Sequence, residues 1–166
     1  MKKQNVLPLT RAGAIAALYV ALTYVSYLVG LSSGAIQLRL SEMLCVLPAF
    51  LPESIPALYI GCLLANLLTG GSIFDILLGS LATLIGAFFA RVLRKTDRPI
   101  LIALPTVIAN ALIVPLVIIL SAGGEETFAS FPYLALTVGI GEFLSAAVLG
   151  ALLYRIIKKN HILPKL

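Results

Sequence analysis

The feature that most constrains this chain is the length of its uncharged stretches: no charged residue lies between Arg11 and Arg39. Across all 166 residues, 60% are apolar and only 11% are charged. A soluble domain typically has about 45–50% apolar and about 25% charged residues. The composition therefore excludes a disordered chain and an ordinary cytosolic enzyme, and it predicts a protein whose solvent is the lipid bilayer.

Six apolar segments follow one another, separated by charges, glycines and prolines. We expect helices, because lipid admits only helices and closed barrels, and strand-like alternation is confined to residues 36–40. A span needs about 20 apolar residues, so six spans leave no room for a second domain. The sequence thus predicts an all-α membrane protein in which residues 1–166 form a single domain, a six-transmembrane-helix bundle. The predicted segments are 10–30, 41–51, 54–68, 73–93, 100–121 and 131–157.

The basic residues predict the orientation of these spans. Eleven of the 12 Lys and Arg residues lie before the first span, between the fourth and fifth, or after the sixth, so six crossings place them on one side. The positive-inside rule makes that side the cytoplasm. We therefore expect a multi-pass protein of the cell membrane with both termini cytoplasmic. The net charge of +5 then reflects topology, and no nucleic-acid partner is expected. Cleavage of the first span as a signal peptide would break this pattern, so we expect the span to be retained.

Several kinds of chemistry have no residues to carry them. The single histidine, His161, lies beside Lys158 and Lys159 and is expected to be solvated, which argues against a His-dependent intramembrane hydrolase. The sequence has no GxxxxGK[ST] loop for ATP hydrolysis and no acidic cluster for Mg²⁺. Cys45 and Cys62 are expected to be small buried residues. We expect no enzyme, metal or cofactor, which leaves recognition, passage or scaffolding.

Polar residues inside apolar spans are the candidates for function. Glu142, next to Gly141 in the sixth span, costs roughly 2.5–3.5 kcal/mol at a helix centre, and either a ligand or proton role or a structural pair would explain it. Asn66 and Asn110 carry amides that suit the edge of a heterocycle, although bonds between helices are an equal alternative. Asp75 begins the fourth span, where it is either a site residue or a charge stabilised by the helix dipole.

The segment from Gln37 to Glu42 is the most unusual stretch. Arg39 is the one basic residue outside the three clusters. Arg39 and Glu42 would pair in a helix, because residues three apart share a face. The alternation at 36–40 indicates instead an extended stretch that enters a helix at Ser41, a good N-cap residue. In both cases polar groups, including Gln37, are delivered to the outer mouth of the bundle, as a binding site or as an interfacial ion pair.

The first span carries small residues at helical spacing, which allows close helix packing in lipid. We expect either packing within the bundle or docking to another membrane subunit. These residues are Ala12, Gly13, Ala16, Ala17 and Ala21.

Taken together, these residues resemble the substrate-binding (S) components of energy-coupling-factor (ECF) transporters. The six-span plan and the Ala12–Ala16 spacing are shared by ECF binders in general. More specific is the similarity to the queuosine-precursor (QueT) branch, which covers nearly the whole chain. It is carried by residues 35–42 with Leu47 and Pro48, by Gly61 and Asn66, by residues 74–84, and by Gly141 and Glu142.

The resemblance implies a membrane-embedded binder that captures a 7-deazaguanine precursor of queuosine from outside the cell. Its partners would be a transmembrane coupling protein and two ATPase subunits on separate chains. Under this interpretation Glu142 meets the N–H donors of a guanine-like edge, Asn66 and Asn110 meet carbonyl and ring nitrogens, and Gln37, Arg39 and Glu42 close the outer mouth. The alternatives are an S component for another vitamin, a small proton-coupled carrier using Glu142, and a structural subunit without a ligand.

Overall fold

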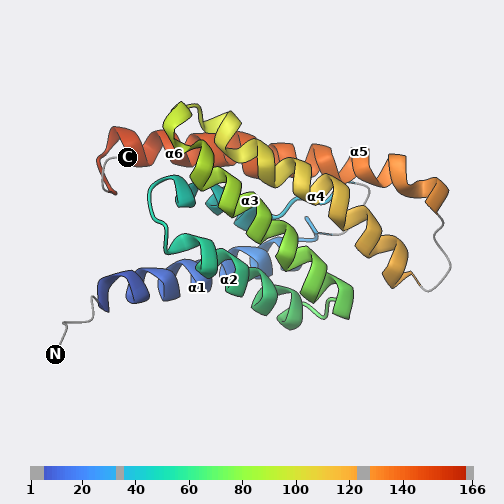
Figure 1. The fold of residues 1–166 in the computed structure, drawn as a ribbon. Coiled ribbons are helices and arrows are strands. Elements are labelled where there is room, and N and C mark those ends of the chain that lie inside the picture. The colour runs from blue at the N-terminus through green and yellow to red at the C-terminus, as the bar shows by residue number, and fades with distance from the viewer. Residues whose placement is uncertain (1–5, 33–35, 123–127, 164–166) are drawn as a thin grey trace.

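The computed structural model of this chain describes residues 6–32, 36–122 and 128–163. Within these ranges every regular element is helical, which confirms the predicted all-α fold class. Six α-helices form an elongated bundle (Figure 1). They are α1 (Val6–Leu28), α2 (Ser54–Leu68), α3 (Ser80–Val92), α4 (Pro99–Ser121), α5 (Phe131–Glu142) and α6 (Gly150–Lys159).

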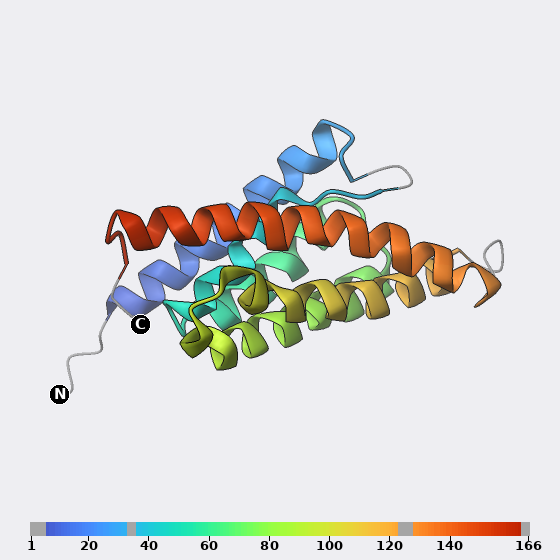
Figure 2. The same cartoon turned by 90° about the horizontal axis from the view of Figure 1, so that it is seen from above.

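Shorter helical pieces extend or connect these α-helices. The 3-10 helices are Leu40–Ala49, Leu93–Thr96 and Phe128–Ser130, and the π-helical stretches are Asp75–Gly79 and Phe143–Leu149. The second π-helical stretch joins α5 to α6, and the three pieces form one continuous rod (Figure 2). This rod corresponds to the sixth predicted segment, 131–157.

All six predicted apolar segments are helical, but they differ in length. Four helical runs are long and apolar enough to cross a membrane, namely Val6–Leu28, Asp75–Thr96, Pro99–Ser121 and Phe128–Lys159. The second and third segments form the shorter apolar helices Leu40–Ala49 and Ser54–Leu68. At about 1.5 Å per residue, α2 spans about 22 Å, less than the roughly 30 Å hydrocarbon core of a bilayer.

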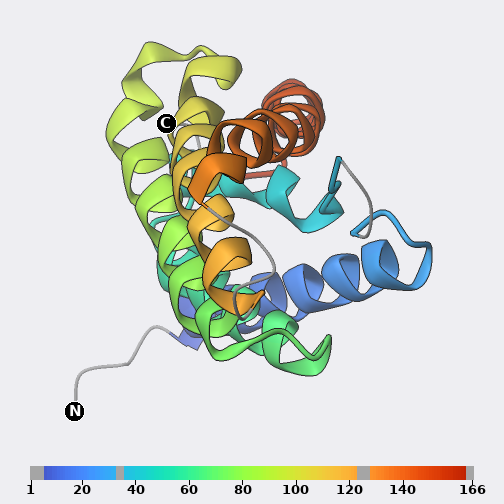
Figure 3. The ribbon, with the colours of Figure 1, turned by 90° about the vertical axis from the view of Figure 1, so that its right-hand side faces the viewer.

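The 3-10 helix Leu40–Ala49 lies at the centre of the bundle, between α1 and the α5–α6 rod (Figure 3). Eight of its ten residues are buried. It begins one residue before the predicted start at Ser41, and it is a 3-10 helix, about 20 Å long at about 2.0 Å per residue. Arg91 of α3 holds its far end, because the guanidinium Nη1 donates to the carbonyl oxygens of Pro48 and Ala49 at 3.1 and 3.0 Å.

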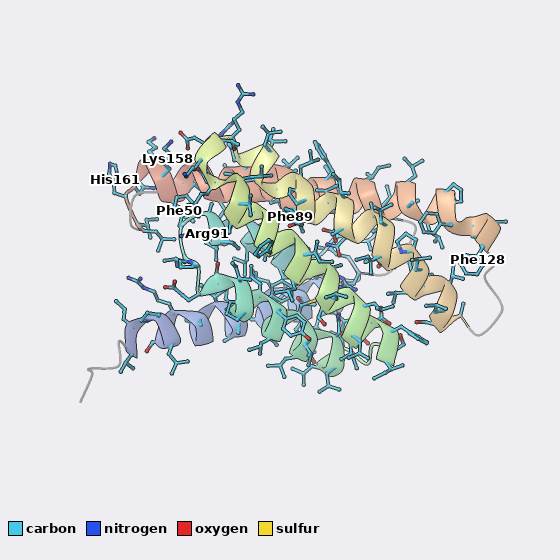
Figure 4. The ribbon with its side chains drawn as sticks, in the orientation of Figure 1. Phe50, Phe89, Arg91, Phe128, Lys158 and His161 are labelled. Carbon is cyan, nitrogen blue, oxygen red and sulfur yellow. The ribbon has the colours of Figure 1, made fainter. Side chains whose placement is uncertain are left out.

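The basic clusters described by the structure gather at one end of the bundle. There α1 begins, α6 ends, and Arg91 and Lys158 lie together with the exposed His161, while Phe128 lies at the opposite end (Figure 4). Arg11 of α1 and Glu53 before α2 form an ion pair of 3.6 Å at this end. The arrangement is the one that an even number of crossings requires.

Candidate functional site

Glu42 is the most deeply buried charged side chain near the bundle centre, with 1% of its surface exposed. The hydroxyl of Tyr19 on α1 donates a short hydrogen bond to its Oε1, and the Cys45 thiol donates to Oε2 at 3.2 Å. Both carboxylate oxygens therefore already have protein partners. Through its hydrogen bond with Tyr19, Glu42 links the 3-10 helix to α1. The two cysteines, Cys45 and Cys62, are free and buried, as predicted.

A seam of hydroxyl groups on α1 holds the entrance to the 3-10 helix. The Thr23 hydroxyl donates to Ser41 Oγ at 2.7 Å, and the Leu40 backbone N–H donates to Ser26 Oγ at 3.0 Å. Ser41 makes no cap hydrogen bond, so the predicted N-cap role of Ser41 is wrong. The 3-10 helix already begins at Leu40, so Ser41 lies inside it. The Ser41 hydroxyl oxygen accepts the hydrogen bond from Thr23 of α1.

Arg39 has extended backbone geometry (φ −110°, ψ 106°), which agrees with the extended alternative and not with a helical Arg39–Glu42 pair. Its Nη1 donates to the Asn66 side-chain oxygen at 3.4 Å, and Asn66 Nδ2 donates to the Asp75 carbonyl at 2.8 Å. Among the described residues no carboxylate lies within ion-pairing distance of Arg39. The guanidinium still interacts electrostatically with Glu42 and Glu142. Arg39 is thus a half-buried cation that interacts electrostatically with two carboxylates without forming an ion pair with either in the described structure.

Asp75 lies in the first turn of the helix that begins after Ser72. Its Oδ2 accepts from the Ser72 backbone N–H at 2.9 Å and from the Ser72 hydroxyl at 2.7 Å, while Ser72 Oγ accepts from the Asp75 N–H at 3.1 Å. This reciprocal arrangement is a capping box, in which two backbone donors at a helix start are satisfied. The geometry agrees with the helix-terminal alternative for Asp75, and it gives the carboxylate a local structural partner.

Glu142 and Asn110 differ from the residues above, because each retains a buried polar atom without a partner. Glu142 on α5 is 6% exposed and Asn110 on α4 is 3% exposed. The Asn110 side chain lies near enough to act on the Glu142 carboxylate, but the two do not reach the geometry of a hydrogen bond. Among the residues that the structure describes, neither Glu142 Oε2 nor Asn110 Nδ2 has a hydrogen-bond partner. An unsatisfied polar group away from water costs several kcal/mol in lipid. The pair therefore offers one acceptor and one donor to a bound molecule.

The Gln37 backbone lies against Gly141, the residue that precedes Glu142. A Cβ atom built on Gly141 would lie 2.0 Å from the Gln37 carbonyl oxygen, so the extended segment that contains Gln37 crosses α5 directly beside Glu142. Only a residue without a side chain permits this approach. The crossing brings the extended segment, Arg39 and Glu142 together from parts of the chain about 100 residues apart in sequence.

The small residues of α1 separate into two faces. Ala12 and Ala16 pack against the core, and a Cβ on Gly61 of α2 would lie 3.1 Å from the Ala16 carbonyl oxygen. Gly13, Ala17 and Ala21 are exposed, and a Cβ on Gly13 would meet nothing within 4 Å. Packing within the bundle therefore accounts for the first pair, and the exposed three remain available to another chain.

Several polar residues that contribute here were missed in the sequence. Tyr19, Thr23 and Ser26 form the α1 seam, and Thr106 and Ser145 have buried hydroxyl oxygens that lack partners among the described residues. Thr106 lies four residues before Asn110 and Ser145 three residues after Glu142, so each shares a helix face with a candidate. This helical spacing is the sequence signal that could have identified Thr106 and Ser145 as candidates.

Comparison with known proteins agrees with the arrangement. A family model described as QueT transporter matches residues 9–159. The curated protein named Queuosine precursor transporter QueT, from Lactococcus lactis subsp. cremoris (strain MG1363), is 39% identical over 85 residues, which are 51% of this chain and 50% of that protein. The match thus spans about half the length of that relative. No solved structure matches the chain significantly. Since the family model covers nearly all of a membrane bundle with a buried polar centre, this chain belongs to the QueT transporter family.

Proposed function

We propose that this protein is the membrane-embedded substrate-binding subunit of an ECF-type importer and that it captures a queuosine precursor, a 7-deazaguanine-like base. The observation that carries the proposal is the pair of unpartnered atoms, Glu142 Oε2 and Asn110 Nδ2, buried between α4 and α5. A guanine-type edge presents adjacent N–H donors to a carboxylate and a carbonyl to an amide donor, so one planar ligand would satisfy both atoms.

The proposed ligand is supported by the relative, whose name assigns it a queuosine precursor as substrate. Around Glu142, the extended segment supplies Gln37 and Arg39, and Asn66 links Arg39 to the start of the fourth span. In this proposal Glu42 and Asp75 position the surrounding helices, since the Glu42 oxygens are bonded to Tyr19 and Cys45 and Asp75 is bonded to Ser72. The site thus lies at the junction of α4, α5 and the extended segment.

The orientation belongs to the same proposal. The basic residues gather at one end of the bundle, and we place that end, with both termini, in the cytoplasm. The extended segment then enters from the outer side, where an importer would meet its ligand. ATP hydrolysis would occur on two partner ATPase subunits, because the chain itself has no P-loop sequence.

The purified full chain is expected to bind a 7-deazaguanine base with one-to-one stoichiometry and to exclude adenine, whose edge does not offer the same adjacent donors. Isothermal titration measures the binding, and mass spectrometry of the small molecule that co-purifies with the chain identifies the natural ligand. A different co-purifying vitamin would reject the precursor while keeping the S-component role.

A proton-coupled carrier is the second candidate, favoured by the buried, partly unpaired carboxylate of Glu142. The two functions differ in their energy source. Uptake into cells that stops when the partner ATPases are removed supports the ECF importer. Uptake that continues without them but stops when the proton gradient is collapsed supports the carrier.

Gly13, Ala17 and Ala21 are the proposed docking stripe for the transmembrane coupling protein, because they form the exposed small-residue face of α1. Ala17→Trp is expected to abolish co-purification with the coupling protein and reduce uptake at least about tenfold, while ligand binding by the isolated chain is unchanged. The bulky indole prevents the close approach that small residues permit. Pull-down assays measure co-purification, uptake assays measure transport, and titration of the isolated chain measures ligand binding.

Leu18→Trp is the matched control, because Leu18 is exposed and one helical residue turns the side chain by about 100°. It is expected to retain assembly and uptake. Ala16→Trp is unsuitable as a test, since Ala16 lies against Gly61 and the indole would disrupt the α1–α2 contact. Normal uptake by Ala17→Trp would show that the exposed stripe does not dock.

A further inference from the structure

An open pocket of about 450 Å³ lies at the end of the bundle where α4 begins and α6 ends. It is separate from the buried polar centre and belongs to the end that carries Lys158 (Figure 4). Four of the six lining residues are charged. The lining consists of Asp97, Pro99, Tyr154, Arg155, Lys158 and Lys159.

The single acidic residue of the pocket is already paired. Asp97 accepts a short hydrogen bond from Lys158 Nζ and a bond of 2.8 Å from the Tyr154 hydroxyl. These two donors, Lys158 first, lower the pKa of the Asp97 carboxyl below its ordinary value, so the carboxylate stays charged and holds Lys158. Arg155 and Lys159 are exposed, and neither forms an ion pair with any residue in the described ranges. The pocket therefore presents two uncompensated positive charges.

An apolar strip leads from the body of the bundle to these charges. Leu152 and Ile156 lie on the same face of α6 as Arg155 and Lys159, because the four residues have i, i+3, i+4, i+7 spacing. Leu152 is 56% exposed and Ile156 is 44% exposed. On a helix that spans a membrane, such side chains face lipid tails, and the basic residues one turn further lie at the depth of the headgroups.

We propose that the pocket binds the phosphate of an anionic phospholipid through Arg155 and Lys159, with an acyl chain along Leu152 and Ile156. The two cations can donate together to the two non-bridging oxygens of a singly charged phosphodiester, and the apolar strip matches the lipid tail. An acidic protein segment would satisfy only the charges and would leave the strip exposed. The combination of charge and continuous apolar surface therefore selects a lipid.

The full chain in detergent is titrated with phosphatidylglycerol, phosphatidylcholine, glycerol 3-phosphate or inorganic phosphate. Native mass spectrometry counts bound molecules and thermal unfolding measures stabilisation. We expect retained phosphatidylglycerol and a raised Tm, at least about tenfold weaker retention of phosphatidylcholine, and no comparable effect of the two water-soluble phosphates. The double variant R155Q/K159Q is expected to lose the preference for phosphatidylglycerol.

The matched control is R94Q/K95Q, which removes the same charge from the 3-10 helix Leu93–Thr96, directly before Asp97 in sequence but outside the pocket lining. It is expected to keep the lipid preference. Equal losses in the two double variants would overturn the proposal, because a general attraction of basic surface to anionic lipid would then suffice. Equal binding of inorganic phosphate would also overturn it, since the apolar strip would then contribute nothing. Arg155, Lys159 and Lys95 are exposed and Arg94 is half-buried, so unchanged gel filtration and Tm of each lipid-free variant verify that both fold.

Discussion

Replacing Glu142 with glutamine is expected to lower affinity for the queuosine precursor by at least about tenfold. Glutamine keeps the shape of the side chain but removes the charge and presents an N–H donor to the N–H donors of the ligand. A hydrogen bond to a charged group contributes about 1.5–3 kcal/mol, and each 1.4 kcal/mol is about a factor of ten in affinity. Titration of the purified variant with the 7-deazaguanine base measures the change.

Loss of folding would not explain this result, because burying a neutral amide in lipid costs less than burying a carboxylate. The variant should therefore insert and unfold at a temperature no lower than the native protein. Glu42→Gln provides the contrast: it disturbs the bonds with Tyr19 and Cys45, so it is expected to lower the Tm. Unchanged affinity in Glu142→Gln would remove Glu142 from the site.

The fold could be predicted from sequence to the extent that lipid dictates it. In a bilayer each backbone group must be bonded internally, so an apolar run of sufficient length is a helix whatever its neighbours are. This reasoning does not predict the structure of Leu40–Ala49 in full. Its composition indicates an apolar helix, but its 3-10 geometry and central place depend on Thr23, Ser26 and Arg91, which bond to it from other helices. Such contacts leave no periodic pattern in the segment itself.

The site divides in the same way. A rare charge such as Glu142 is conspicuous in an apolar span, so sequence identifies it as a candidate. Sequence cannot distinguish a carboxylate whose oxygens are bonded, like that of Glu42, from one with a free oxygen, like that of Glu142. The difference depends on Tyr19 and Cys45, and Tyr19 is 23 residues away. For Asp75 the sequence held more, because Ser72 lies three residues before it at capping-box spacing.

The second large effect is expected from Gly141→Ala, which adds one methyl group where the extended segment crosses α5. The new Cβ would lie 2.0 Å from the Gln37 carbonyl oxygen, so the backbone of this segment must move by more than 1 Å. Overpacking of this kind costs about 1–3 kcal/mol. Because the displaced segment carries Arg39, which interacts with Glu142, we expect ligand affinity to fall at least about tenfold together with the Tm.

Gly139→Ala is the control that isolates this contact. It lies two residues earlier on α5, and its Cβ would meet the Ala111 Cβ at an ordinary 3.5 Å. Both variants gain the same helix propensity, roughly 1 kcal/mol for glycine to alanine, so that contribution cancels in the comparison. We expect Gly139→Ala to bind ligand like the native protein. If Gly141→Ala binds equally well, the extended segment does not shape the site, and Glu142 and Asn110 must recognise the ligand without it.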